Sequence, residues 1–310
     1  MSHATGGSEF AAIDRLADRL RAACGHPPAG ELWIGDDAAV VEVGGGRIVV
    51  AADAVVGGVH ADLGLTTAAD LGWRALAVNV SDLAAMGCVA TRAVVTIAAP
   101  DVDSVDAVYE GLAEAAAAFG CPIVGGDLTS GPALVVSVTV LGDAAVTPAP
   151  VGRRGAQPGD ELWASGPFGA AAAGLRHLRA GDAAADQAAA HARPQPRTAE
   201  GVAARELGAT AMIDVSDGFV ADLAHLLDGS GVGVVLDTVP VATGATRTEA
   251  LTGGDDYELV WACPAGTELS GPFAARGLRP PLLLGHTVAD PAARTVRGQP
   301  LTGRGWDHWA

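Results

Sequence analysis

A chain of 310 residues with a formal charge of −17 and 49% hydrophobic residues is long enough for two domains of ordinary size. Its acidity argues against a nucleic-acid partner, because such proteins gain affinity from basic residues that contact phosphates. Its 19 basic residues are all arginine, which excludes P-loop and Schiff-base mechanisms because both need a lysine.

The chain shows no sign of a membrane or secretory segment. No apolar run approaches the roughly 20 residues that a membrane span needs, so we expect no membrane partner. The opening residues, MSHATGGSEF, lack the basic patch and apolar stretch of a secretory signal. Four scattered cysteines without a C-x-x-C pair fit reduced, buried thiols. We therefore predict a cytoplasmic protein.

Apolar spacing predicts alternating helices and strands in the first half. Helices are expected over 10–23, 67–87 and 104–120, and a break at 79–82 in the second of these is left open. Gly120 is expected to end the third helix. Strands are expected over 47–56, 92–100, 121–127 and 133–144.

A segment rich in proline and glycine, 146–160, separates this half from the next, so we predict domains over 1–148 and 149–310. The second half repeats the alternation. Strands are expected over 161–165, 210–217 and 232–241, and helices over 169–181, 198–209 and 219–231. Residues 182–197 read as a helix followed by a linker, and the C-terminal region as a hairpin. The fold class is therefore α/β with mixed (α+β) sheets.

Aspartates beside glycine or serine recur within apolar sequence. They stand in IGDDAAV (34–40), VNVSDLAAMG (78–87), IVGGDLTSG (123–131), MIDVSDGF (212–219) and LTGGDDYELV (251–260). Surface carboxylates usually lie among other charged and polar residues, and these do not. For any one aspartate alone, a role in capping a helix or forming a turn is an even alternative.

Taken together, these junctions favour a metal site. Carboxylates gathered in one place raise one another's pKa unless cations neutralise them. Mg²⁺ takes carboxylate and phosphate oxygens, and glycine lets a phosphate approach the backbone closely. The pattern therefore predicts a Mg²⁺-dependent, phosphate-handling enzyme.

The same segments, together with AADAVVGGVH (51–60) and RRGAQPGDELWASGPFGAAAAGL (153–175), resemble in their order the thiamine-monophosphate kinases. These enzymes belong to the aminoimidazole-ribonucleotide-synthetase-like ATP-binding superfamily. The resemblance covers residues 9–309. It implies a two-domain synthetase-like fold whose N-terminal domain binds ATP and Mg²⁺ and closes a barrel across a homodimer. It also implies transfer of a phosphoryl group from ATP to thiamine monophosphate, giving thiamine diphosphate.

The resemblance also implies site residues. The implied Mg²⁺ ligands are Asp36, Asp53, Asp82, Asp127, Asp214 and Asp217. The implied nucleotide contacts are Tyr109, Gly126, Asp127, Arg153 and Ser216. The implied contacts to the thiamine end are His60, Asp255 and Trp306. Asp127, Asp217 and Arg153 are assigned to catalysis; a phosphate oxygen is already a nucleophile, so alignment and charge neutralisation suffice.

Several positions depart from the family pattern. Ala51 and Ala52 stand where the family has hydroxyl residues, and Leu128 and Ser130 replace a threonine and an arginine. Asp255 shortens a glutamate by one methylene. Two alternatives therefore stay open: a related ATP-dependent enzyme acting on another phosphorylated small molecule, and a non-catalytic nucleotide-binding homologue.

Overall fold

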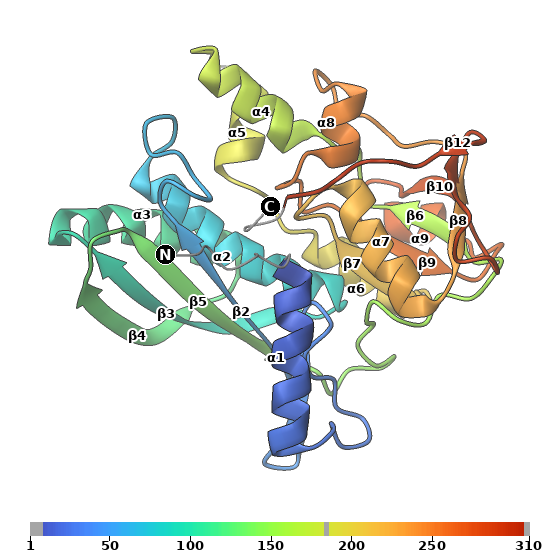
Figure 1. Ribbon diagram of the computed structural model, residues 1–310. Helices are drawn as coiled ribbons and strands as arrows, with labels where there is room; N and C mark the ends of the chain where they lie inside the picture. Colours follow the sequence, from blue (N-terminus) through green and yellow to red (C-terminus); the bar gives the residue numbers. More distant parts are fainter. Residues whose placement is uncertain (1–8, 183–185, 307–310) are drawn as a thin grey trace, which may run out of the picture.

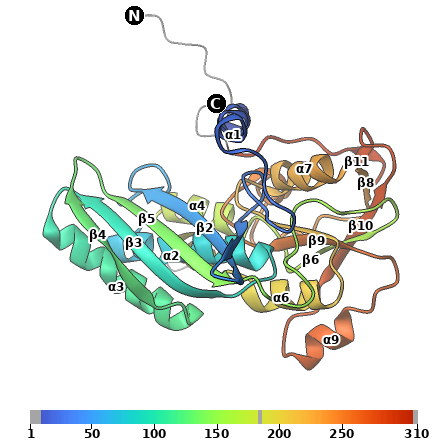
Figure 2. The ribbon, with the colours of Figure 1, turned by 90° about the horizontal axis from the view of Figure 1, so that it is seen from below.

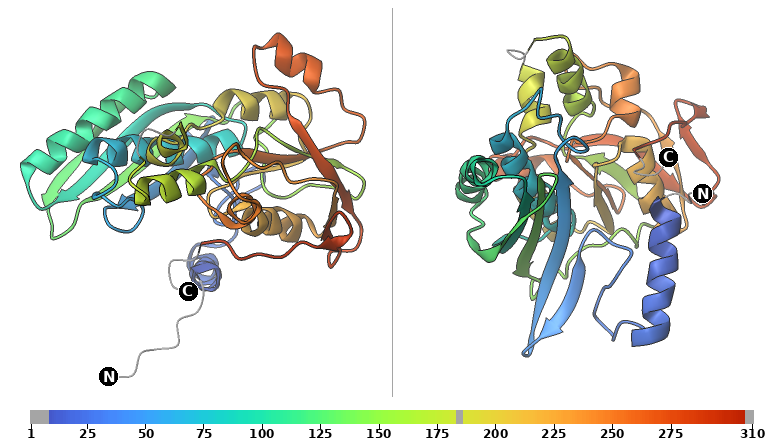
Figure 3. Two further views of the ribbon diagram at one scale, coloured as in Figure 1. Left: turned by 90° about the horizontal axis from the view of Figure 1, so that it is seen from above. Right: turned by 60° about the vertical axis from the view of Figure 1, so that its left-hand side comes forward.

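Two mixed β-sheets form the framework of the protein (Figure 1). The computed structural model describes residues 9–182 and 186–306. Within these ranges, no helix combines the length and the apolar character that crossing a membrane requires. Helix α1 (Glu9–Cys24) projects away from both sheets (Figures 1 and 3).

The first sheet has five strands in the order β1-β2-β5-β3-β4. They are β1 (Ala39–Val43), β2 (Gly46–Val56), β3 (Ala90–Ala99), β4 (Ile123–Ser130) and β5 (Val135–Asp143). All neighbours are antiparallel except β3 and β4, which are parallel. Helices α2 (Ala68–Ala85) and α3 (Val102–Phe119) cover one face of this sheet (Figure 2).

Local sequence explains where these two helices begin and end. Thr67 and Asp70 form a capping box at the start of α2, and Asp101 caps α3. Gly120 ends α3 with a left-handed φ of 64°, as predicted. These devices satisfy backbone N–H and C=O groups that have no partner inside the helix.

The break left open at 79–82 is absent, because α2 runs without interruption to Ala85. Polar side chains in this stretch find partners outside the helix as well as within it. Asn79 donates to the Ala75 carbonyl of the same helix at 2.9 Å and accepts the N–H of Asp53 on β2 at 2.8 Å. Ser81 donates to Asp214 at 2.5 Å. Tertiary contacts, which the local sequence does not reveal, thus keep this polar stretch helical.

The other face of the first sheet is open to solvent. Along β3, Ala93, Val95 and Ile97 are buried, whereas Val94 and Thr96 on the opposite face are exposed. The edge strand β4 is exposed over 124–130. The described part of a single chain therefore leaves one face and one edge of this sheet without cover.

The second sheet has seven strands in the order β12-β11-β8-β10-β6-β9-β7. They are β6 (Glu161–Ala164), β7 (Ala211–Asp214), β8 (Gly233–Leu236), β9 (Leu259–Cys263), β10 (Leu282–Val288), β11 (Arg294–Val296) and β12 (Gln299–Pro300). The helices of this half are α4 (Ala170–Arg179), α5 (Asp186–Ala192), α6 (Thr198–Glu206), α7 (Phe219–Ser230), α8 (Arg247–Thr252) and α9 (Ser270–Ala275). The predicted C-terminal hairpin is confirmed as β11–β12. Five elements were not predicted: β1, β9, β10, α8 and α9.

Helix α2 is the element that joins the two halves. It packs against β2, β5 and α3 of the first half, and against α6 and β7 of the second. Its residues are buried almost along its whole length, so the 3.6-residue pattern of a one-sided helix is weak. The polar residues near its C-terminal end, Ser81 and Asp82, consequently lie where the two sheets meet.

Candidate active site

Three aspartates from distant parts of the chain converge between the two halves. Carboxylate oxygens of Asp37, Asp82 and Asp214 all lie within 4.8 Å of one another. Asp37 precedes β1, Asp82 lies on α2, and Asp214 is the last residue of β7. We call these three the aspartate trio. Hard oxygen ligands at this spacing are the donors that Mg²⁺ prefers.

Asp37 shows most clearly that the trio fits a cation. Its side chain is 1% exposed, and its Oδ1 accepts hydrogen bonds from Arg153 Nε at 3.1 Å and Nη2 at 2.5 Å. Its Oδ2 is buried and has no hydrogen-bond donor among the described residues. A buried acceptor without a donor is costly, and a bound cation would remove that cost.

Burial and mutual repulsion perturb the trio electrostatically. Loss of hydration, with Asp37 next in importance, raises the pKa of Asp214 to about 7. Burial, followed by the nearby Asp53 and Asp214, raises the pKa of Asp82 well above its ordinary value. Asp82 and Asp214 are therefore protonated more readily than ordinary aspartates, and a bound cation would favour their charged forms.

Asp36 lies outside the trio, although the resemblance assigned it, and not Asp37, to the metal. Its carboxylate accepts the backbone N–H of Arg153 at 3.0 Å and that of Asp37 at 3.1 Å. Burial, and then Asp37, raises its pKa to about 6. Asp36 thus ties the loop at 34–37 to the segment at 153. Adjacent residues in a loop point in different directions, which the sequence G-D-D does not disclose.

The trio forms part of the wall of a cavity of about 1340 Å³ between the two halves. The sequence-predicted residues that line this cavity, besides Asp36, Asp82 and Asp214, are Asp53, His60, Arg153, Ser216, Asp217, Asp255 and Trp306. The structure therefore brings together most of the predicted site, from both halves of the chain.

Three predicted residues are not among the described residues that line this cavity: Tyr109, Gly126 and Asp127. Asp127 lies on β4, opposite Thr96 on β3. Thr96 lies opposite Ser137 on β5, and Ser137 lies opposite Ala54 on β2, the neighbour of Asp53. Three strand spacings amount to about 14 Å, too far for Asp53 and Asp127 of one chain to share an ion. Tyr109 is on α3 and packs against the first core.

The far end of the cavity is built around Asp255. This residue has a left-handed φ of 69°, unusual for a residue other than glycine. Its Oδ1 pairs with Arg74 Nη1 at 2.7 Å and accepts the Tyr257 hydroxyl at 3.2 Å, while its Oδ2 lies 3.8 Å from His191 Nδ1. The carboxylate is thereby held in one orientation.

Sequence reasoning missed Arg74, which is 2% exposed. Burial is the strongest single effect and disfavours its charge, but Asp255 and Tyr257 together outweigh burial and raise its pKa. Burial and then Arg74 lower the pKa of His191 to about 4, so this histidine is neutral at neutral pH. The available signal was an arginine inside the apolar run LGWRALAV, because a charge buried in a helix requires a partner.

The remaining residues predicted for the thiamine end are fixed through the backbone. His60 Nδ1 accepts the N–H of Val56 at 3.0 Å, which sets the orientation of the ring. The backbone N–H of Trp306 donates to the Asp217 carbonyl at 3.0 Å, and its side chain is 56% exposed at the cavity. Trp306 is thus placed beside the segment that carries Asp217.

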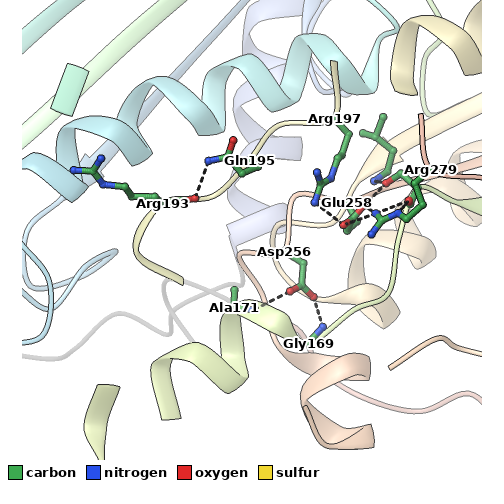
Figure 4. Close-up of polar contacts among 10 residues, drawn as sticks. Gly169, Ala171, Arg193, Gln195, Arg197, Asp256, Glu258 and Arg279 are labelled. Carbon is green, nitrogen blue, oxygen red and sulfur yellow. Dashed lines mark hydrogen bonds and ion pairs between the residues drawn. The ribbon is translucent and has the colours of Figure 1, made fainter. Parts of the chain in front are cut away.

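The segment after Asp255 is anchored by the carboxylates of Asp256 and Glu258 (Figure 4). Asp256 accepts the backbone N–H groups of Gly169 and Ala171 at the start of α4. Glu258 is 5% exposed and pairs with Arg197 at 2.8 Å and Arg279 at 3.0 Å. These contacts make the segment a rigid support for Asp255.

The fold and the site define a class of protein. The family model of the AIR synthase related protein N-terminal domain matches residues 35–144, and that of the C-terminal domain matches residues 157–294. The chain is therefore an AIR synthase related protein, built from both domains of that class.

Closer relatives narrow the class to a family. The chain is 40% identical to a thiamine-monophosphate kinase of Mycobacterium tuberculosis, over 96% of this chain and 90% of that protein. It is 34% identical to that of Escherichia coli, over 97% and 98% of the two chains. The chain belongs to the thiamine-monophosphate kinase family.

Solved structures agree with this assignment. The structure described as AaThiL complexed with AMPPCP and TMP superposes with a TM-score of 0.84, at 27% identity, over 99% of this chain and all of that one. The thiamine-monophosphate kinase of Stenotrophomonas maltophilia superposes with a TM-score of 0.74, at 34% identity, over 94% and 97% of the two chains.

Proposed function

We propose that this chain transfers a phosphoryl group from ATP to the phosphate of thiamine monophosphate, giving thiamine diphosphate and ADP. The observation that carries the proposal is the aspartate trio, with its unpartnered Asp37 oxygen, in the wall of the cavity that also contains Asp255. Membership of the kinase family supports it. So does the likeness to a structure that holds AMPPCP and TMP together.

The trio fits Mg²⁺ by the chemistry of its donors. Asp37, Asp82 and Asp214 would hold the ion, with Asp53 and Asp217 lining the same cavity. When bound, Mg²⁺ would neutralise charge on the phosphates of both substrates. No side chain has to act as a general base, because the attacking phosphate oxygen is already anionic.

Arg153 is the residue of this chain best placed to hold the transferred phosphoryl group. Its guanidinium contacts Asp37 at the trio and lines the cavity. Arginine presents several N–H donors in a fixed plane, which suits phosphate oxygens. We assign Ser216, in the neighbouring loop, to the nucleotide as well.

The other end of the cavity suits the thiamine part of the acceptor. Trp306 offers a ring face that attracts a cationic thiazolium, and Asp255 offers an oriented carboxylate. His60 lines the same cavity. The acceptor would thus lie with its phosphate toward the trio and its rings toward Asp255.

We also propose that the active form is a homodimer in which the first sheets of two subunits close a barrel. The open face of this sheet and the exposed edge strand β4 support this assembly. It also accounts for Tyr109, Gly126 and Asp127, which lie away from the cavity of their own chain and would serve the partner's site. We retain domains over 1–148 and 149–310 and a cytoplasmic location, which three buried free cysteines suit.

Coupled release of ADP tests the proposed function. Purified protein is incubated with ATP and Mg²⁺, with and without thiamine monophosphate, and the product is identified chromatographically. We expect one thiamine diphosphate for each ADP. Binding of ATP without stimulation by thiamine monophosphate would contradict the acceptor. A turnover with another phosphorylated heterocycle would then indicate a related enzyme, and none at all a non-catalytic homologue.

A further inference from the structure

One loop connects the two ends of the cavity. The loop at 214–218 carries Asp214 and Asp217, and its carbonyls accept hydrogen bonds from residues of the thiamine end. The Ser216 carbonyl accepts the N–H of Asp255 at 2.7 Å, and the Asp217 carbonyl accepts the N–H of Trp306 at 3.0 Å. The positions of Asp255 and Trp306 therefore depend on the position of this loop.

Glycines make the contact between these segments close. A Cβ at Gly254 would collide with the Ser216 carbonyl, and a Cβ at Gly305 would collide with the Asp217 carbonyl. Gly218 has a φ of 126°, which side chains rarely adopt, and it lies against the backbone of Thr252. Three chain segments are thus packed backbone to backbone, so a shift of the loop at 214–218 moves the other two.

Asp222 holds this loop through hydrogen bonds to its backbone. It lies in the first turn of α7, is 3% exposed, and is not among the described residues that line the cavity. Its Oδ2 accepts the backbone N–H of Asp217 at 3.0 Å and that of Gly218 at 2.9 Å. No helical carbonyl is available to these two N–H groups, since they precede α7. Removing the Asp222 carboxylate would leave both without their acceptor.

We propose that Asp222 is a positioning residue for the phosphoryl transfer. By holding the N–H groups of Asp217 and Gly218, it places the Asp217 carboxylate at the metal end. Through the same loop it places Asp255 and Trp306 at the thiamine end. This inference rests on the proposed function, and it predicts that one side chain outside the cavity sets the affinity for both Mg²⁺ and the acceptor.

Asp160 provides a matched control for a merely structural role. It is also a buried aspartate of the second half, 6% exposed. It accepts the backbone N–H of Gln157 at 2.9 Å and the hydroxyl of Thr210 at 2.7 Å. It does not line the cavity, so its removal should weaken the fold without displacing the loop at 214–218.

The test compares Asp222→Ala, Asp222→Asn and Asp160→Ala with the unmodified chain. KM for thiamine monophosphate, the Mg²⁺ concentration for half-maximal rate, kcat and the melting temperature are measured for each. In Asp222→Ala we expect both concentrations to rise by roughly tenfold or more, because two N–H groups lose their acceptor. Asp222→Asn keeps an acceptor oxygen and should restore both to within about threefold. Asp160→Ala should lower only the melting temperature.

Two results would overturn the inference. One is an Asp222→Ala enzyme with unchanged KM and Mg²⁺ requirement, and the other is an equal rise of both in Asp160→Ala. If Asp222→Ala does not fold, Asp222→Glu decides, because its extra methylene must displace the loop and raise both values. An unmodified chain that forms no thiamine diphosphate contradicts the proposed function instead, and is recognised before any variant is compared.

Discussion

The two ends of the cavity differ in how far the charges of their carboxylates are balanced by other residues. At the metal end, three carboxylates lie within 4.8 Å, and one buried oxygen has no donor among the described residues. At the thiamine end, the single carboxylate of Asp255 is already paired with Arg74 and hydrogen-bonded to Tyr257. Under the proposed function, the trio would gain most from a bound cation, whereas Asp255 is held in one orientation before any ligand arrives.

Because of this difference, we expect the metal end to bind its ligand mainly through charge and the thiamine end mainly through shape. Repulsion among the trio is energy that a divalent ion releases when it binds, so affinity at this end comes from charge. Asp255 and Arg74 largely cancel each other's charge, so the thiamine end offers an oriented acceptor and not a negative field. Removing a charge should consequently stabilise the protein at one end and destabilise it at the other.

The largest effect is expected at the metal end, for Asp82→Asn. Loss of this carboxylate should reduce kcat/KM by about a thousandfold, because it removes a metal ligand. Measured in EDTA, the same change should raise the melting temperature, because burial and the carboxylates of Asp53 and Asp214 disfavour the charge of Asp82. Asp18→Asn, on exposed α1, is the control and should change neither quantity. A variant that lost activity and stability together would show that Asp82 is chiefly structural.

The next effect concerns pH without metal. Asp214 has a pKa raised to about 7 in the folded protein, whereas an unfolded aspartate titrates near 3.9. Its contribution to stability is fully present below the unfolded pKa and is lost as pH rises through about 7. In EDTA, the melting temperature should fall by several degrees between pH 5 and pH 8. Millimolar Mg²⁺ should remove that fall, and an identical profile with Mg²⁺ would refute a metal site at the trio.

A smaller effect is expected at the thiamine end, for Arg74→Met. The substitution keeps most of the buried volume but leaves Asp255 without its cation, which should lower the unfolding free energy by roughly 2 kcal/mol. Arg193→Met is the control: Arg193 is one-third exposed and pairs with Asp70, so its loss should cost at most about 1 kcal/mol. Urea denaturation measures both. Equal losses of unfolding free energy in the two variants would mean that the buried Arg74–Asp255 pair stabilises the protein no more than the exposed Arg193–Asp70 pair.

The smallest effect concerns His191, whose contribution to stability changes with pH in the direction opposite to that of Asp214. His191 has a pKa lowered to about 4, so its contribution is present above its unfolded pKa near 6.5 and is lost as pH falls toward 4. In His191→Asn, the loss of stability between pH 6.5 and pH 5.5 should shrink by roughly 1 kcal/mol. Urea denaturation at the two pH values checks this. An unchanged loss would assign the acid sensitivity to other groups.

Much of the architecture could be read from local sequence. The helix ended by Gly120, four of the five strands of the first sheet and the hairpin near the C-terminus follow from periodicity, capping residues and turn residues, all of which act over a few positions. Short elements such as α8 and α9 were not predicted, because six residues make less than two helical turns and show too little periodicity. The resemblance of the motifs identified the family, which the relatives confirm.

The sequence by itself thus determined the order of elements, the chemistry of the site and the family. Only the tertiary structure decided which aspartate of G-D-D joins the trio, that Asp127 lies across the sheet from Asp53, and that Arg74 and Asp222 support the two ends. The physical reason is the separation along the chain between the residues that interact. Hydrogen-bonded periodicity is set by neighbours along the chain, whereas side-chain direction and charge pairing depend on contacts between residues more than a hundred positions apart.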